Sequence, residues 1–236
     1  MTINHIVIDN PEVIREILAA TDAILLDFDG PVCSVFSGVS ANHVAEQLRI
    51  KLRCHTRTRL PVRIEETQDP FDIFRYSADL NKRTAVYIES ALTTYELEAV
   101  DYAEPTPSSG DFIREWIATG RKLAIVTNNS PKAVYRYAQI HKIEQLGDVV
   151  FGRNSSNPML LKPSSHALQD ALTSLQTDPT RSLFVGDSLT DQLAAAKVAG
   201  LRFIGFINKE SKLRTFANIP VAALVRNFET FRKALP

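Results

Sequence analysis

Residues 23–30 of this chain read AILLDFDG, an unbroken apolar run that ends in two aspartates and a glycine. A strand with one face in water alternates apolar and polar residues, whereas a continuous apolar run indicates a strand buried on both faces, as in parallel sheets. We therefore predict a central strand over residues 23–28. Its carboxyl end carries Asp27 and Asp29, in the position where open α/β sheets bind their ligands.

After residue 110 the sequence alternates short aliphatic runs with longer amphipathic segments. This pattern is typical of parallel strands joined by helices, and it predicts an α/β fold with a doubly wound, Rossmann-like sheet flanked by helices. Asn10 and Pro11 are a typical start for a helix before the first strand. Helices are predicted at 111–119, 131–141, 164–175 and 189–199, and strands at 122–127, 148–151, 182–186 and 201–206.

Residues 34–103 interrupt this pattern, because they are first polar and irregular and then helical, with no strand between. The segment EPTPSSG, residues 104–110, follows; its prolines cannot continue a helix and suit a stiff hinge. We therefore expect a small α-helical cap domain over residues 34–103. The core domain would consist of residues 1–33 and 104–236.

The composition is that of a globular protein, with 236 residues of which 44% are hydrophobic. The 27 basic residues balance the 27 acidic ones, so no overall field favours nucleic acid or an anionic membrane. Two cysteines cannot build a disulfide framework. The first residues lack the features of a signal peptide, and no stretch approaches the ~20 apolar residues of a membrane helix. We expect a cytoplasmic protein that binds neither nucleic acid nor membrane.

Polar residues follow four of the predicted strands. Asp27 and Asp29 are close enough to repel each other, and a metal ion or a held proton is the usual way in which such a pair is tolerated. The alternative explanation is a strand-end turn, with Gly30 and Pro31 as its signal.

Thr127 ends a second strand, and Asn128 follows it just before a helix begins. A hydroxyl and the amide groups at a helix start can donate hydrogen bonds to phosphate oxygens. Lys162 precedes another helix and offers a point charge for phosphate. An ordinary helix cap and a solvated lysine are the competing interpretations.

Gly186 and Asp187 follow a further apolar strand, and Asp191 comes four residues later. A carboxylate at a strand end suits Mg²⁺, which takes few protein ligands and keeps several waters. Asp191 would order a metal-bound water or the ammonium group of Lys162. Capping of the following helix by Ser188 would account for the same residues structurally.

Together these residues resemble the haloacid dehalogenase superfamily, whose four ordered motifs are matched by Asp27-Phe28-Asp29-Gly30, Thr127, Lys162, and Gly186-Asp187 with Asp191. The resemblance implies that Asp27 is the nucleophile, which forms an aspartyl-phosphate. It implies that Asp29 protonates the leaving oxygen and then activates water. A carboxylate at Asp29 also favours phosphorus over carbon chemistry, because the dehalogenases of the family lack one there.

The resemblance assigns the remaining residues as well. Thr127, Asn128 and Lys162 would bind the phosphate group. Mg²⁺ would be held by Asp27, Asp187 and the backbone carbonyl of Asp29. Gly30, Gly186 and Asp191 would support the site.

Relatives with a helical cap between the first and second motifs process small soluble substrates. We therefore expect a Mg²⁺-dependent phosphatase for a small phosphorylated metabolite, similar to phosphoglycolate phosphatases. A phosphomutase acting on a sugar phosphate is the nearest alternative, and a non-catalytic protein that binds a phosphorylated ligand is a third. A monomer and a homodimer are both compatible with the sequence.

The expected cap contains several residues with a competing structural explanation. Its basic cluster could clamp a second anionic group of the substrate, although a solvated loop is the favoured interpretation; the cluster comprises Arg53, His55, Arg57, Arg59 and Arg63. His43 is expected on a helix surface rather than as a proton carrier. The aromatic residues are expected to pack the cap helices: Phe71, Phe74, Tyr76 and Tyr87. Cys33 is expected to be a small apolar filler near the hinge.

Overall fold

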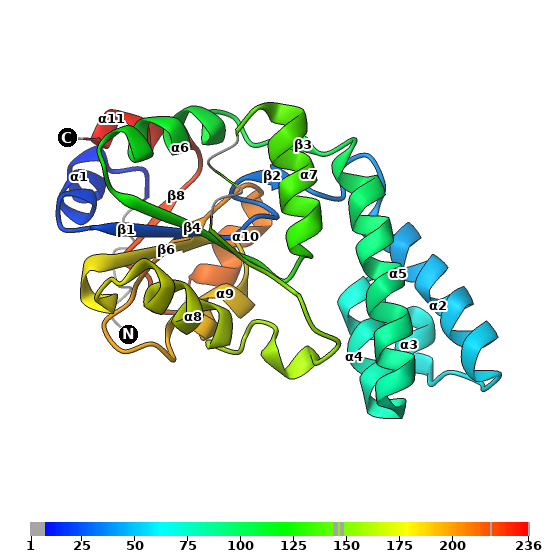
Figure 1. Ribbon diagram of the computed structural model, residues 1–236. Helices are drawn as coiled ribbons and strands as arrows, with labels where there is room; N and C mark the ends of the chain where they lie inside the picture. Colours follow the sequence, from blue (N-terminus) through cyan, green and yellow to red (C-terminus); the bar gives the residue numbers. More distant parts are fainter. Residues whose placement is uncertain (1–7, 144–145, 147–148, 218, 236) are drawn as a thin grey trace.

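A computed structural model describes residues 8–143, 146, 149–217 and 219–235 of the chain. Within these residues six parallel strands form one sheet, and helices cover both of its faces (Figure 1). The strands lie in the order β5 (Val150–Phe151), β4 (Lys122–Val126), β1 (Ala23–Leu26), β6 (Ser182–Gly186), β7 (Arg202–Phe206) and β8 (Ala223–Val225). The predicted α/β fold with a parallel, Rossmann-like sheet is confirmed, and its first strand is central.

The strand order reverses direction at β1, which pairs with β4 on one side and with β6 on the other. After β1 the chain builds outward through β4 and β5, and then returns to build β6, β7 and β8 on the opposite side. Such a reversal leaves a crevice at the carboxyl ends of the central strands. The crevice here lies where β1, β4 and β6 end.

Every residue of β1 is fully buried because the sheet has a hydrophobic core on each face. Ile24 and Leu26 pack into one core, and Ala23 and Leu25 pack into the other. Figure 1 shows α1 (Pro11–Ala19), α6 (Ser109–Ala118) and α11 (Phe228–Ala234) on one face, with α8 (His166–Leu175) and α9 (Leu189–Ala195) on the other. Because side chains on both faces of β1 pack into a hydrophobic core, all of its residues are apolar.

Residues 41–100 fold into four helices beside the sheet, at the right of Figure 1. They are α2 (Ala41–Thr56), α3 (Val62–Glu66), α4 (Pro70–Leu80) and α5 (Lys82–Val100). These helices enclose their own hydrophobic cluster, which includes Leu48, Phe74 and Leu92. The predicted helical insert is present.

A two-stranded antiparallel ribbon joins the insert to the core, which is not apparent from the sequence. It pairs β2 (Cys33–Ser34) with β3 (Glu104–Pro105). The domain boundaries at 33/34 and 103/104 fall in this ribbon and stay a prediction.

Several predicted boundaries differ from those of the structure. The first strand ends at Leu26 rather than at residue 28, because the chain turns at Gly30, whose φ is +113°. The helix predicted over 189–199 is shorter, since α9 ends at Ala195. Residue 148 of the strand predicted at 148–151 lies outside the described residues. The last three elements were not predicted: α10 (Glu210–Phe216), β8 and α11.

Among the described residues, no helix combines the length and the apolar character that crossing a membrane requires.

Candidate active site

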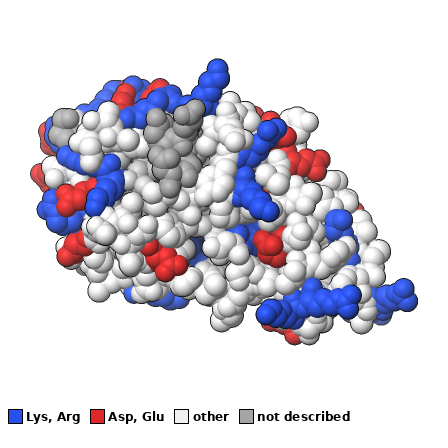
Figure 2. All heavy atoms as spheres, viewed as in Figure 1, with Lys and Arg blue, Asp and Glu red and all other residues white. Residues whose placement is uncertain are grey.

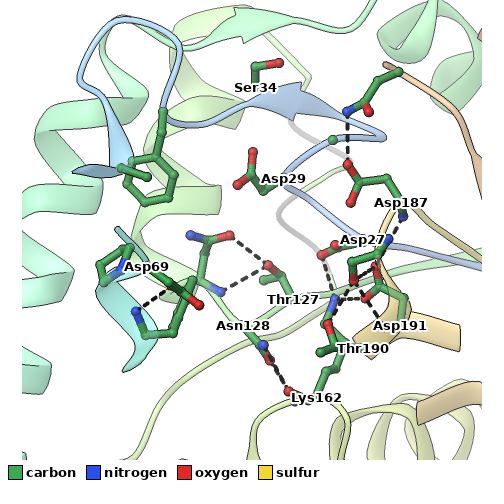
Figure 3. A pocket seen from close by; sticks show the side chains of 18 of the residues that line it. Asp27, Asp29, Ser34, Asp69, Thr127, Asn128, Lys162, Asp187, Thr190 and Asp191 are labelled. Carbon is green, nitrogen blue, oxygen red and sulfur yellow. Dashed lines mark hydrogen bonds and ion pairs between the residues drawn. The ribbon is translucent and has the colours of Figure 1, made fainter. Parts of the chain in front are cut away.

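A cavity of about 910 Å³ opens at the carboxyl ends of β1, β4 and β6. Predicted site residues from all four motifs line it: Asp27, Asp29, Gly30, Thr127, Asn128, Lys162, Asp187 and Asp191. Figure 3 shows the side chains of these residues, Gly30 apart, converging from separate loops. The chain thus brings together residues that are up to 164 positions apart, as 191 − 27 gives.

Lys162 lies between two carboxylates and is itself only 3% exposed. Its Nζ is 2.8 Å from Oδ1 of Asp27 and 2.6 Å from Oδ1 of Asp191 (Figure 3). It also donates a hydrogen bond to the backbone oxygen of Val126, at 3.1 Å. Burial acts to lower the pKa of Lys162, but Asp191 and Asp27 outweigh burial and raise it. Lys162 is therefore held as an ammonium ion.

Asp27 is buried in a group of like charges. Burial and the carboxylate of Asp191 raise its pKa, with a further contribution from Asp187, whereas Lys162 acts in the opposite direction. The ammonium group of Lys162 is shared between Asp27 and Asp191, so it neutralises Asp27 only in part. A second cation at this place would favour the ionised form of Asp27 that a nucleophile requires.

Asp29 is the acid–base candidate of the cavity. Burial raises its pKa to about 6, although a hydrogen bond from the backbone N–H of Val35 to its Oδ1, at 2.9 Å, favours the ionised form. A carboxyl group with a pKa near 6 can both give and accept a proton close to neutral pH. This property is what the two roles expected of Asp29 require.

Asp187 is placed by contacts that include two residues not predicted from the sequence. Its Oδ2 accepts a hydrogen bond from Nδ2 of Asn208 at 3.0 Å and lies 3.1 Å from Nζ of Lys212. Burial raises the pKa of Asp187, and Lys212 partly counters this. Asn208 lies two residues after the end of β7. Because ligands bind at the carboxyl ends of parallel strands, its position could have marked it as a candidate site residue. Lys212 lies on α10, a helix that was not predicted.

Two glycines allow the carboxylates to approach the backbone. A Cβ on Gly30 would lie 2.3 Å from Oδ2 of Asp187, and the φ of +113° at this residue disfavours any side chain. A Cβ on Gly186 would lie 2.6 Å from Cβ of Asp191. Gly186 does not line the cavity; it leaves room for Asp191 against the backbone, and its supporting role in the site stays a prediction.

The carboxylates offer a suitable place for a divalent cation. One carboxylate oxygen from each of Asp27, Asp187 and Asp191 lies within 4.8 Å of the others. Asp191 is already engaged, because its Oδ2 accepts hydrogen bonds from Ser188 and from the backbone N–H of Asp187. Its Oδ1 pairs with Lys162, so both oxygens of Asp191 are occupied. Asp27 and Asp187 each have only one oxygen engaged among the described residues, Oδ1 of Asp27 by Lys162 and Oδ2 of Asp187 by Asn208 and Lys212. Their second, hard oxygens would fit Mg²⁺, and this ligand set stays a prediction. The side chain of Asp29 is not in this group; the resemblance implied only its backbone carbonyl.

The loop after β4 is held in a defined shape. Thr127 Oγ1 donates a hydrogen bond to Oδ1 of Asn129 at 3.0 Å and accepts one from the backbone N–H of Asn129 at 3.1 Å. The side chain of Asn128 bonds the backbone of Lys162 twice, with its Oδ1 accepting from N at 2.8 Å and its Nδ2 donating to O at 3.3 Å. Asn128 thus ties the second motif loop to the third, and its role in binding phosphate stays a prediction.

The insert contributes the opposite wall of the cavity, through residues that were not predicted to do so: Phe36, Gln68, Asp69 and Arg75, together with Phe71, which was expected to pack the cap. Arg75 lies 3.0 Å from Asp72 and 3.8 Å from Asp69. No local pattern distinguishes Arg75 from the other arginines of the insert.

The basic cluster of the insert lies away from this cavity. Figure 2 shows Lys and Arg side chains gathered at the end of the insert remote from the sheet, at the lower right. Arg53 pairs with Glu65, and Arg63 lies 3.9 Å from Asp79. The cavity lining contains neither these arginines, nor Arg57, Arg59, His55 or His43. These residues are therefore not placed to clamp a substrate in this cavity, and the favoured interpretation of the cluster as solvent-exposed agrees with the structure.

The other expected cap residues have structural surroundings. Phe74 is fully buried in the hydrophobic cluster of the insert, and Phe71 and Tyr76 pack against that cluster. Tyr87 stacks on His55 with ring centroids 4.6 Å apart. Burial raises the pKa of Cys33, which keeps this thiol protonated.

The sequence matches the haloacid dehalogenase-like hydrolase family over residues 24–206. This range covers more than three quarters of the 236 residues, since 206 − 24 + 1 gives 183. The match confirms the resemblance that the four motifs indicated, and with it the prediction of a hydrolytic enzyme. No protein of curated function matches the sequence.

Solved structures of low sequence identity share the fold. A protein provisionally assigned as a phosphoglycolate phosphatase, from Lactobacillus plantarum, is 16% identical with a TM-score of 0.66, over 91% of this chain and 99% of that one. A predicted phosphatase from Clostridium acetobutylicum is 14% identical with a TM-score of 0.65, over 90% and 97%. CbbY from Rhodobacter sphaeroides, in complex with phosphate, is 21% identical with a TM-score of 0.61, over 88% and 95%.

Proposed function

Because the chain belongs to the haloacid dehalogenase-like hydrolase family, we propose that it is a Mg²⁺-dependent phosphatase that hydrolyses a small phosphorylated metabolite. The observation that carries this proposal is the cluster around Lys162. One buried ammonium group joins Asp27 to Asp191. A third aspartate, Asp187, and a protonatable carboxyl, Asp29, lie beside them.

In the first step, a carboxylate oxygen of Asp27 attacks the phosphorus atom of the substrate. The bond from phosphorus to the ester oxygen breaks, and Asp29 gives its proton to that leaving oxygen. Thr127 and Lys162 bind the phosphoryl oxygens and offset their negative charge. The products of this step are the free alcohol and an aspartyl-phosphate on Asp27.

In the second step, Asp29 is a carboxylate and accepts a proton from a water molecule. The water oxygen attacks phosphorus, the bond from phosphorus to Asp27 breaks, and inorganic phosphate leaves. Mg²⁺, when held by Asp27, Asp187 and the backbone carbonyl of Asp29, would reduce the repulsion between the anionic nucleophile and the anionic substrate.

Two further observations support a phosphorylated substrate. CbbY, which shares the fold, holds phosphate in its crystal structure. The cavity also has a volume suited to a small metabolite, about 910 Å³. In this proposal residues 34–103 act as a cap whose cavity-facing side chains distinguish substrates.

Phosphate release from para-nitrophenyl phosphate and from a panel of phosphorylated metabolites tests the proposal. We expect Mg²⁺-dependent release by the natural chain and a loss of roughly 10⁴-fold or more in Asp27→Asn, since the amide is a poor nucleophile. Equal rates in the two proteins would refute it. Conversion of a sugar phosphate into its isomer, with little free phosphate, would instead indicate the phosphomutase. Phosphate binding without turnover of any ester would indicate the non-catalytic alternative.

A further inference from the structure

Arg153 is buried where the insert meets the core, although it belongs to none of the four motifs. It follows β5, and its side chain is only 1% exposed. Its guanidinium donates to three residues of α5, with distances of 2.9 and 2.7 Å to Glu96, 3.2 Å to Glu89 and 3.2 Å to Thr93. A fifth hydrogen bond, at 2.8 Å, goes to the backbone oxygen of Asn128. Arg153 therefore connects the long helix of the insert to the second motif loop.

Glu96 is the fully buried partner of Arg153 and accepts four hydrogen bonds. Each of its oxygens accepts one bond from Arg153. Oε1 also accepts from Nδ2 of Asn129 at 3.1 Å, and Oε2 accepts from the backbone N–H of Ser130 at 3.0 Å. A buried carboxylate is costly unless it is paired and fully hydrogen-bonded. Glu96 therefore depends on both Arg153 and the loop being in place.

Asn129 connects Glu96 to Thr127 through hydrogen bonds of its side-chain amide. The amide of Asn129 donates to Glu96, and its Oδ1 accepts the hydrogen bond from Thr127 Oγ1 at 3.0 Å. An amide has one donor side and one acceptor side, so the bond to Glu96 decides which side faces Thr127. The hydroxyl of Thr127 is thus positioned through Asn129 by a carboxylate of the insert.

A second helix of the insert also contacts Arg153. The rings of Phe71 and Phe74, both on α4, have centroids 5.7 Å from its guanidinium carbon. Phe71 in turn lines the catalytic cavity. Arg153 therefore touches both insert helices that face the core and the loop that carries Thr127.

We propose that Arg153 and Glu96 are positioning residues, which hold Thr127 in its phosphate-binding position only while α5 is docked on the core. The proposal rests on the proposed function in one respect, namely that Thr127 binds the transferred phosphoryl group. Neither residue touches the reacting atoms. Their effect on turnover must therefore pass through Asn129 and Thr127.

A double-mutant cycle between Glu96 and Thr127 tests this dependence, with para-nitrophenyl phosphate as the probe. We expect Glu96→Gln to lower kcat roughly tenfold in the natural chain, because small misplacements of a binding group cost about this much or more. In a Thr127→Ala background the same change should cost less than about twofold. An equal loss in both backgrounds would overturn the proposal, since it would mean that Glu96 acts independently of Thr127.

The chain offers a matched control for this cycle. Arg136 on α7 (Pro131–His141) bonds Asp101 at the end of α5, at 2.7 Å, and this pair also joins the insert to the core. It is partly exposed and has no hydrogen bond to the Thr127 loop. Arg136→Met should leave kcat within about twofold of the natural chain. Arg153→Lys keeps the charge but loses the bidentate geometry, and it should lower kcat by an intermediate factor.

Amide hydrogen exchange gives a measurement that does not depend on turnover. The double variant Glu96→Leu with Arg153→Met removes both buried charges, so folding should be retained. We expect faster exchange in a peptide covering residues 127–134 than in Arg136→Met, because Ser130 loses its acceptor. Unchanged exchange would overturn the proposal. If the protein hydrolyses no phosphate ester, exchange still decides the coupling, so the two proposals can fail separately.

Discussion

The two walls of the catalytic cavity are built in different ways. On the wall formed by the sheet, the motif side chains Asp27, Lys162 and Asp191 are buried, and Lys162 is held by both of the carboxylates. The wall formed by the insert carries half-exposed side chains, and its Arg75 has a side-chain exposure of 37%. Fixed groups suit a reaction whose geometry is constant, whereas exposed groups can vary without disturbing the core. This difference is the reason why we propose that the sheet wall carries the chemistry and the insert wall selects the substrate.

The largest effect should follow from removing the cation of the sheet wall. Lys162→Met leaves the carboxylates of Asp27 and Asp191 without their ammonium partner, and in the proposed reaction it also removes a donor to the phosphoryl group. We expect kcat for para-nitrophenyl phosphate to fall roughly 10³-fold, with a modest change in KM. A melting curve of the variant shows whether the fall in kcat is due to unfolding. A variant that melts like the natural chain and keeps its kcat would contradict the assignment of chemistry to this wall.

A change in the insert wall should affect binding rather than chemistry. Arg75→Met removes the arginine that faces the cavity from α4. For whichever metabolite the panel identifies, we expect KM to rise roughly tenfold while kcat changes by less than about threefold. Arg63→Met, at the remote end of the insert, is the control and should change neither constant. A fall in kcat with KM unchanged would remove the distinction between the walls.

A smaller effect is expected where the sheet wall meets α10. Lys212 lies 3.1 Å from Oδ2 of Asp187 and therefore competes with a cation for this ligand. Lys212→Met should lower the Mg²⁺ concentration needed for half-maximal binding by about two- to fivefold. Calorimetric titration of the metal-free protein with Mg²⁺ measures this directly. Lys209→Met, whose residue lines the cavity but is not paired with Asp187, is the control. Weaker Mg²⁺ binding in Lys212→Met would show that Lys212 assists the metal instead.

The smallest effect concerns the stability of the metal-free protein. Burial raises the pKa of Asp29 from 3.8 to about 6, so the folded chain binds this proton more tightly than the unfolded chain. The cost of ionising Asp29 in the folded chain is fully present above pH 6, shrinks as the pH falls from 6 toward 3.8, and is absent below 3.8. Two pKa units correspond to about 3 kcal/mol at most, and partial exposure reduces the cost to about 1–2 kcal/mol.

Asp29→Asn should therefore melt a few degrees above the natural chain at pH 8, in the presence of a chelator. The advantage should shrink to a small fraction at pH 4, because the folded chain keeps Asp29 protonated there while the unfolded chain, with the ordinary pKa of 3.8, is only partly protonated. If the melting temperatures of the two proteins differed equally at pH 8 and at pH 4, titration of Asp29 would not be the cause of the difference.

The core of the fold was predictable because its signals are local. The apolar run ending at Asp27 indicates a strand buried on both faces, and β1 is such a strand. Elements after residue 206 were missed because β8 has only three residues and α10 and α11 have seven each. Segments this short show too little periodicity to be recognised.

The sequence by itself determined the α/β fold and which residues meet at the strand ends, because parallel topology brings the ends of neighbouring strands to one edge. Only the tertiary structure decided which distant side chains pair with one another around the site. Glu96 and Arg153 are 57 positions apart, and Lys212 lies 25 positions after Asp187, as 212 − 187 gives. No local pattern encodes such pairs, since an ion pair depends on how helices dock and not on the residues adjacent in the chain.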